Sequence, residues 1–105
     1  MRTKQTEKKG NFEMIYIGVD FGDARVGLAK SDPAGILAGA VGTLKVRGLA
    51  DAAEQTAEAV ARLGGTAVVV GLPRNMDGTE GFRAERTRRF AALVAEKTGA
   101  EVVFV

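Results

Sequence analysis

The sequence contains no cysteine and no histidine, and these two absences limit the chemistry available to its 105 residues. Without cysteine there are no disulfides, no thiolate metal ligands and no thiol nucleophile. Without histidine there is no serine–histidine triad, no imidazole base and no imidazole metal ligand. A metal site in this chain therefore depends on oxygen ligands, which favour hard cations such as Mg²⁺, Mn²⁺ or Ca²⁺.

Tryptophan is also absent, and no apolar run approaches the roughly 18 residues that a membrane-spanning helix needs. The basic N-terminus is not followed by an apolar stretch, so it does not have the pattern of a signal peptide. A hydrophobic content of 46% is enough for one core, and the length favours a single domain. We therefore expect a cytoplasmic protein with no membrane partner.

Residues 1–13 are polar and basic and show no periodicity, so we expect a disordered basic arm, with the domain in residues 14–105. Its basic side chains account for the net charge of +2, and the remainder is close to neutral. Nucleic-acid affinity in the domain must therefore come from a local patch.

The hydrophobic pattern predicts three strands, a helix, a strand, a second helix and a last strand. The first strand, Met14–Phe21, is expected to be buried on both faces and to form an antiparallel hairpin with the second. Thr79 is expected to cap the second helix, with Glu80 in its first turn and Phe82 on its inner face. The expected elements are Met14–Phe21, Arg25–Ser31, Ile36–Val46 with a bulge near Gly39 or Gly42, Leu49–Leu63, Thr66–Gly71, a helix to about Thr98, and Glu101–Val105.

This order predicts a mixed α/β sheet with the first strand in the middle, between its hairpin partner and a parallel strand. Ligands in such sheets bind at the carboxyl ends of the central strands, where Asp20, Gly71 and Val105 would meet. Asp20 follows a strongly apolar run, so its carboxylate needs a partner. A metal ion, nearby backbone amides and Arg25 all remain possible partners from the residues alone.

Two motifs resemble the YqgF family, also called RuvX, whose members are described as Holliday-junction resolvases or pre-16S rRNA nucleases. The first motif is Gly18-Val19-Asp20-Phe21-Gly22 followed by Arg25-Val26-Gly27-Leu28-Ala29, Ser31-Asp32 and Gly35. The second, and more specific, is Val69-Val70-Gly71-Leu72-Pro73-Arg74-Asn75-Met76-Asp77-Gly78-Thr79-Glu80-Gly81. The resemblance implies a ribonuclease-H-like fold and a nuclease that uses Mg²⁺ or Mn²⁺.

The resemblance also implies roles for individual residues. Asp20 matches the catalytic carboxylate that helps to hold the metal. Arg25 matches a basic residue of the family, and the other side chains that we expect to contact nucleic acid are Lys30, Arg74, Asn75 and Arg83. Arg74 departs from the family, where an apolar residue is usual, so it is either an additional phosphate contact or neutral variation. Turn and loop residues that would support the site are Gly22, Asp32, Gly71, Pro73, Asp77 and Gly78. A purely structural role remains possible for three of these residues. Gly22 would be an ordinary hairpin glycine, Arg25 an ion-pair partner of Asp20 or Asp23, and Asp32 an ordinary turn residue.

Family members continue with an Asp-Glu-Arg-like motif and a helix that carries a further Asp, and this chain ends where the motif would begin. We therefore expect the carboxyl-terminal part of the fold to be missing and the 105-residue chain to be inactive or nearly so. The predicted partner is precursor rRNA or branched DNA, and monomer and dimer both remain open. Two alternatives are a nucleic-acid-binding module without catalysis and a phosphate-binding half of an actin-like or Hsp70-like ATP-binding fold.

Overall fold

The computed structural model of the chain describes residues 14–31 and 37–105, which form five strands and two helices. The expected N-terminal arm and the turn that contains Asp32 lie outside these residues. The elements are β1 (Tyr16–Phe21), β2 (Arg25–Ser31), β3 (Leu37–Lys45), α1 (Leu49–Leu63), β4 (Ala67–Val70), α2 (Phe82–Thr98) and β5 (Glu101–Phe104).

The strands form one mixed sheet in the order β3-β2-β1-β4-β5. The pairs β1–β2 and β2–β3 are antiparallel, whereas β1–β4 and β4–β5 are parallel. The central position of β1 and its two neighbours were predicted correctly. The irregularity expected in the third strand is present too, as register shifts where β3 pairs with β2 at the sheet edge.

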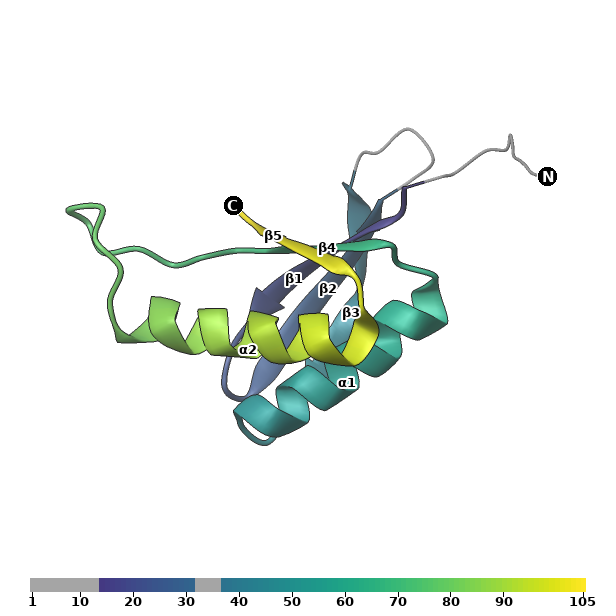
Figure 1. The fold of residues 1–105 in the computed structure, drawn as a ribbon, viewed down its shortest axis with the longest axis horizontal. Coiled ribbons are helices and arrows are strands. Elements are labelled where there is room, and N and C mark those ends of the chain that lie inside the picture. Colours follow the sequence, from purple (N-terminus) through teal and green to yellow (C-terminus); the bar gives the residue numbers. More distant parts are fainter. Residues whose placement is uncertain (1–13, 32–36) are drawn as a thin grey trace.

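Both helices pack on the same face of the sheet and against each other (Figure 1). Helix α1 has the predicted bounds and ends at Gly64, whose left-handed φ of 74° allows its amide to bond back to the last turn. Helix α2 is held at the end of β1 by Phe90, which is fully buried and stacks on Phe21 with ring centroids 4.5 Å apart. The core lies between this helical layer and the sheet.

The other face of the sheet is uncovered by any described element, which corrects the expectation that β1 is buried on both faces. Side chains of β1 alternate instead, because Ile17 and Val19 point to the helices and are buried, whereas Gly18 and Asp20 face outward. Strand β5 alternates in the same way. The apolar run in β1 was misleading because glycine at position 18 leaves no side chain to bury on the outer face.

Helix α2 begins two residues later than expected, at Phe82, with Gly81 as its N-terminal flanking residue and no side-chain cap. The prediction that Thr79 caps the helix and that Glu80 lies in its first turn was therefore wrong. The hydroxyl of Thr79 is used inside the preceding loop, where it donates to Asp77. The inner position predicted for Phe82 was wrong as well, since 70% of this residue is exposed.

Candidate functional site

Asp20 lies on the uncovered face at the carboxyl end of β1, and its side chain is exposed. Directly across the strand pair lies Gly27, and a Cβ atom built there would be 3.7 Å from the Asp20 Cβ. No hydrogen bond or ion pair within the described residues engages the Asp20 carboxylate. Neither an amide cap nor a pair with Arg25 therefore occupies it in this part of the chain.

A shallow depression of about 380 Å³ surrounds Asp20 on the uncovered face. Its floor is built largely from small residues of four strands, including Gly18, Gly27, Ala29 and Gly71. Its edge includes Val105, whose amide donates to Val70 and whose carbonyl accepts from Leu72. The carboxyl ends of β1, β4 and β5 thus meet beside one exposed carboxylate, as the strand order predicted.

The turn after Asp20 is held in place by backbone hydrogen bonds. The Gly22 amide donates to the Arg25 carbonyl over 2.9 Å, and the carbonyls of Asp23 and Ala24 accept bonds from the segment that leads into α1. A Cβ atom at Gly22 would lie only 2.9 Å from the same Arg25 carbonyl oxygen. Glycine is therefore required at position 22 by the closeness of the turn.

The two basic residues predicted on β2 lie on opposite faces of the sheet. Arg25 is exposed and shares the face of Asp20, because Gly27 pairs with Asp20 and alternate residues of a strand point the same way. Lys30 pairs with Ile17, which is three residues before Asp20 in β1 and points toward the helices. Lys30 therefore lies on the helix face of the sheet. The structure places Arg25 on the same face of the sheet as Asp20 and Lys30 on the opposite face.

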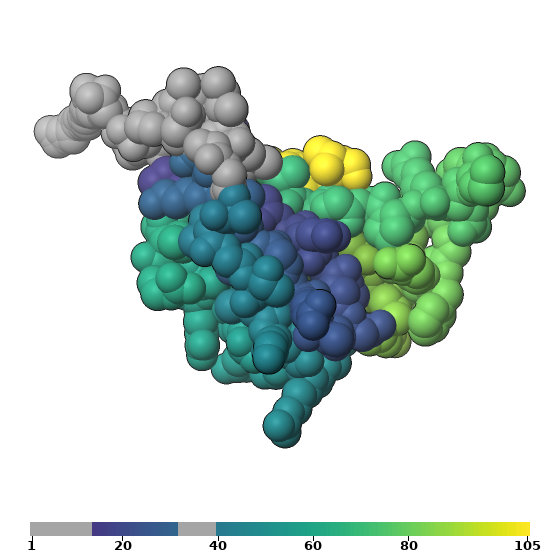
Figure 2. All heavy atoms as spheres, turned by 180° about the vertical axis from the view of Figure 1, so that it is seen from behind, coloured from purple at the N-terminus to yellow at the C-terminus, as the bar shows by residue number. Residues whose placement is uncertain are grey.

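The loop between β4 and α2, residues 71–81, projects beyond the body of the protein (Figure 2). It is closed by its own polar groups, because the Asn75 amide nitrogen donates to the Thr79 hydroxyl and the Asn75 backbone amide donates to the Thr79 carbonyl. Gly78 adopts a φ of 86°, as the predicted Asp-Gly turn requires. The side chains of Asn75 and Asp77 thus shape this loop, and Arg74 is exposed beside them.

The carboxylate of Asp77 accepts two hydrogen bonds from Thr79, one from the hydroxyl over 2.6 Å and one from the backbone amide over 3.0 Å. These bonds favour the charged form, so the hydroxyl of Thr79 first and its amide second lower the pKa of Asp77 from its ordinary value. Asp77 is therefore a charged acceptor that is already engaged within its own loop.

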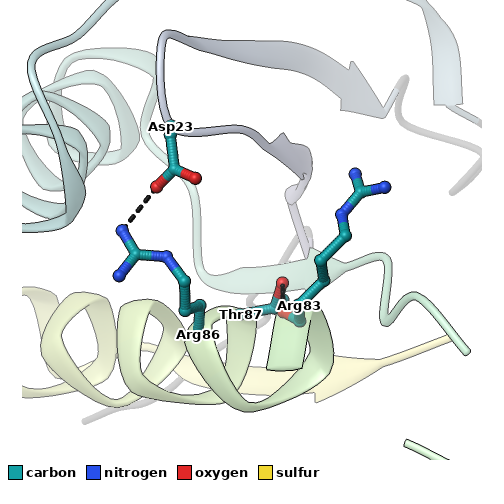
Figure 3. A network of polar contacts seen from close by, with 4 residues as sticks. All are labelled: Asp23, Arg83, Arg86 and Thr87. Atoms are coloured by element: carbon teal, nitrogen blue, oxygen red, sulfur yellow. Dashed lines mark hydrogen bonds and ion pairs between the residues drawn. The ribbon is translucent and has the colours of Figure 1, made fainter. Parts of the chain in front are cut away.

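Two of the four arginines on α2 have carboxylate partners. Arg86 forms an ion pair with Asp23, so that α2 is tied to the turn after β1, whereas Arg83 points away from that pair (Figure 3). Arg88 binds Glu80 through two hydrogen bonds of 2.8 and 2.7 Å, and these bonds lower the pKa of Glu80. Arg83 has no carboxylate partner among the described residues, which leaves it available for phosphate.

The described residues do not by themselves make a divalent-metal site. Nowhere in residues 14–31 and 37–105 do three or more carboxylates gather as potential metal ligands. Asp23, the acid nearest to Asp20 in the chain, is engaged with Arg86. Asp20 is therefore a single candidate ligand, and Mg²⁺ requires several oxygen ligands in near-octahedral geometry.

Two features of the site were missed by the sequence interpretation. Gly27 faces Asp20 and keeps the space beside it open, and the cross-strand register predicted by the hairpin could have identified it. The contact between Asp23 and Arg86 joins residues that are 63 positions apart in the sequence, so no local sequence pattern predicts it.

Comparison with known proteins assigns the chain to a family. Residues 14–105 match the model of the RuvX family, described as Holliday junction resolvase. A protein of Pelotomaculum thermopropionicum named "Putative pre-16S rRNA nuclease" is 45% identical over 83 residues, which cover 78% of this chain and 54% of that protein. One of Acetivibrio thermocellus with the same name is 40% identical, over 80% of this chain and 60% of that protein. The chain thus spans little more than half the length of these curated relatives.

Solved structures support the fold. The RuvC protein of Thermus thermophilus in complex with a Holliday junction substrate matches 88% of this chain and 64% of that chain, with a TM-score of 0.62 and 16% identity. A ROK hexokinase from the same organism matches 88% of this chain and 35% of that chain, with a TM-score of 0.53 and 23% identity. These similarities support the predicted ribonuclease-H-like α/β fold. With its matching motifs, its sheet order and a family match over residues 14–105, the chain belongs to the RuvX family of Holliday junction resolvases and pre-16S rRNA nucleases.

Proposed function

We propose that this chain is the amino-terminal part of a nuclease that hydrolyses phosphodiester bonds in structured nucleic acid, either precursor 16S rRNA or a branched DNA junction. The observation that carries the proposal is the exposed carboxylate of Asp20 at the strand ends, which has no partner among the described residues, in a chain of the RuvX family. In this proposal the enzyme uses Mg²⁺ or Mn²⁺, as the family resemblance implies, and Asp20 is the one ligand that the described residues offer.

The surroundings of Asp20 suit a bulky, negatively charged substrate. The floor of small residues leaves a broad, open depression, and Arg25 adds positive charge on the same face. Arg74 and Arg83 extend this charge along the loop and the start of α2. In this proposal the arginines bind phosphates and Asp20 contributes to the reaction centre.

The remaining carboxylates would come from chain that follows the position of Val105 in longer relatives. Val105 lines the depression that contains Asp20, so a continuing chain would start beside that carboxylate. The 105-residue chain alone would then bind nucleic acid and cleave it poorly or not at all.

The proposal is tested with a chimera that joins residues 14–105 to the part of the Pelotomaculum relative beyond the matched region. Cleavage of a labelled four-way DNA junction and of a precursor 16S rRNA fragment is measured with Mg²⁺ and with Mn²⁺. We expect cleavage by the chimera and a loss of about a hundredfold or more on Asp20→Asn, because removing a metal-binding carboxylate costs several kcal/mol of transition-state stabilisation.

The matched control is Glu58→Gln, which removes the same charge from an exposed position on α1. It should leave cleavage unchanged. A chimera that is folded, binds both substrates and cleaves neither would contradict the nuclease proposal and favour a binding module. Protection by ATP in a thermal melt, without nucleic-acid binding, would favour the phosphate-binding alternative.

A further inference from the structure

Phe82 is the most exposed aromatic side chain in the described part of the protein. It is the first residue of α2 and is 70% exposed. The other described phenylalanines are buried or half-buried, and Phe21 stacks on Phe90. A single exposed apolar side chain needs no explanation by itself, so a role for Phe82 depends on what surrounds the ring.

A small hollow connects Phe82 with the turn after Asp20. Its volume is about 70 Å³, and its walls include Phe82, Pro73, Gly22 and Asp23. This is the space of about two water molecules, which is too little to enclose a nucleobase. A partner of Phe82 would therefore lie on the outer surface of the ring, at the same end of the sheet as Asp20.

Two arginine side chains lie next to Phe82. The Arg86 guanidinium lies 5.9 Å from the centre of the ring and is itself held by Asp23. Arg83 is the next residue in the helix, is exposed, and has no carboxylate partner among the described residues. An exposed ring next to one guanidinium group that has no carboxylate partner among the described residues resembles the arrangement by which proteins hold unpaired nucleic acid, with a base on the ring and a phosphate on the cation.

We propose that Phe82 is a stacking platform for an unpaired nucleobase, with Arg83 contacting an adjacent phosphate. Within the proposed function, which sets its biological context, this platform would select nucleic acid with a displaced or single-stranded nucleotide near the strand ends. Stacking accepts any base, because every base has a π-face, so the selection concerns pairing and not sequence.

The absence of tryptophan makes a direct test possible. In Phe82→Trp the single tryptophan reports on the platform, and its fluorescence is followed as a short oligodeoxythymidylate is added at low salt to the 105-residue chain. We expect strong quenching by the single strand. We expect little by an abasic oligonucleotide of equal length, which has the phosphates without the bases, and little by a duplex of equal length.

Ala61→Trp, at an exposed position on α1, serves as the matched control and should show no quenching by the single strand. Equal quenching of Phe82→Trp by the abasic strand would overturn stacking and leave only charge attraction. Unchanged fluorescence with a bound single strand would overturn the proposal directly.

Affinity gives a second measurement, free of any reporter. Phe82→Leu keeps an apolar side chain but removes the ring, and should weaken single-strand binding roughly 5- to 150-fold, given about 1–3 kcal/mol for one stacked base. Phe82→Tyr should restore binding. An unchanged melting temperature in both variants shows that the fold is intact, as expected for an exposed residue. Equal affinity of Phe82→Leu and the unsubstituted chain would contradict the proposal.

Failure of this inference and failure of the nuclease proposal are distinguishable. Stacking on Phe82 without cleavage by the chimera would support the stacking proposal and contradict the nuclease proposal. The opposite outcome is cleavage that is lost on Asp20→Asn but unaffected by Phe82→Leu, with no quenching of the Phe82→Trp fluorescence. It would support the nuclease proposal and contradict the stacking proposal.

Discussion

Around Asp20 the important residues are those with almost no side chain. Gly18 and Gly71 line the depression, and Gly27 lies opposite the carboxylate. A larger residue at position 27 would fill the space beside Asp20, since even a Cβ there comes into van der Waals contact with it. The accessibility of the carboxylate is therefore set by its neighbours and not by Asp20 itself.

The glycines of the site have different functions, which substitution by alanine separates. At Gly22 an added Cβ would lie 2.9 Å from a backbone oxygen that cannot move without opening the turn. We expect Gly22→Ala to lower the free energy of unfolding by about 1–3 kcal/mol, as overpacked sites do. At Gly71 an added Cβ meets nothing within 4 Å, so Gly71→Ala should leave stability nearly unchanged. Urea unfolding of both variants checks this, and equal stabilities would contradict it.

At the scale of elements, helix α2 carries a cluster of four arginines. Of the arginines on α2, Arg86 fastens the helix to the β1–β2 turn and Arg88 fastens it to the loop and to the ring of Phe104. These contacts position the helix, so that its start and the exposed Arg83 lie at the strand ends. A row of arginines that looks uniform in the sequence is thus divided into positioning residues and available cations.

The loop before α2 should respond to acid through Asp77. Because hydrogen bonds from Thr79 lower the pKa of Asp77, its contribution to loop stability is complete above the ordinary aspartate value near 4 and is lost as the pH falls through the lowered pKa. NMR titration of the Thr79 amide should therefore show a midpoint below the ordinary value.

Thr79→Val removes the hydroxyl that contributes most to this shift, while the backbone amide remains. Its titration midpoint should move upward, toward the ordinary aspartate value. Identical midpoints in the variant and the unsubstituted protein would show that the hydroxyl bond does not hold the carboxylate.

At the scale of the whole molecule, the sheet has one covered face and one open face. Helices α1 and α2 cover one face, and residues such as Val69, Val103 and Val105 belong to the other. Strand β5 is also an edge of the sheet, and no other described strand pairs with its outer side. An apolar face next to an open edge favours association between copies.

Neither of the described helices has the length and the apolar character of a membrane-spanning segment.

We therefore expect the chain to self-associate as its concentration rises, and Val103→Lys to reduce this association. Val103 is 39% exposed, so a lysine there should be tolerated and should add charge to both the open face and the edge. Light scattering with size-exclusion chromatography measures the effect. Ala61→Lys adds the same charge on α1 and should not change it. A monomer at all concentrations would contradict the prediction.

The local elements and their order were determined by the sequence itself. Glycines 64 and 99 end the helices, the Gly-Asp and Asp-Gly pairs make turns, and the apolar runs of β1 and β4 form adjacent strands. These features were predictable because each depends on the preferences of a few consecutive residues. The motif around Asp20 also indicated the family, which the match over residues 14–105 supports.

Only the tertiary structure decided which side chains face water and which charges meet. Whether β1 is covered on one face or two depends on elements distant in the chain, as does the pairing of Asp23 with Arg86. Phe82 fits a helical inner stripe in the sequence, but α2 starts only there, so the ring lies at an open helix end. Such contacts depend on packing between segments, which hydrophobic periodicity within a single segment does not encode.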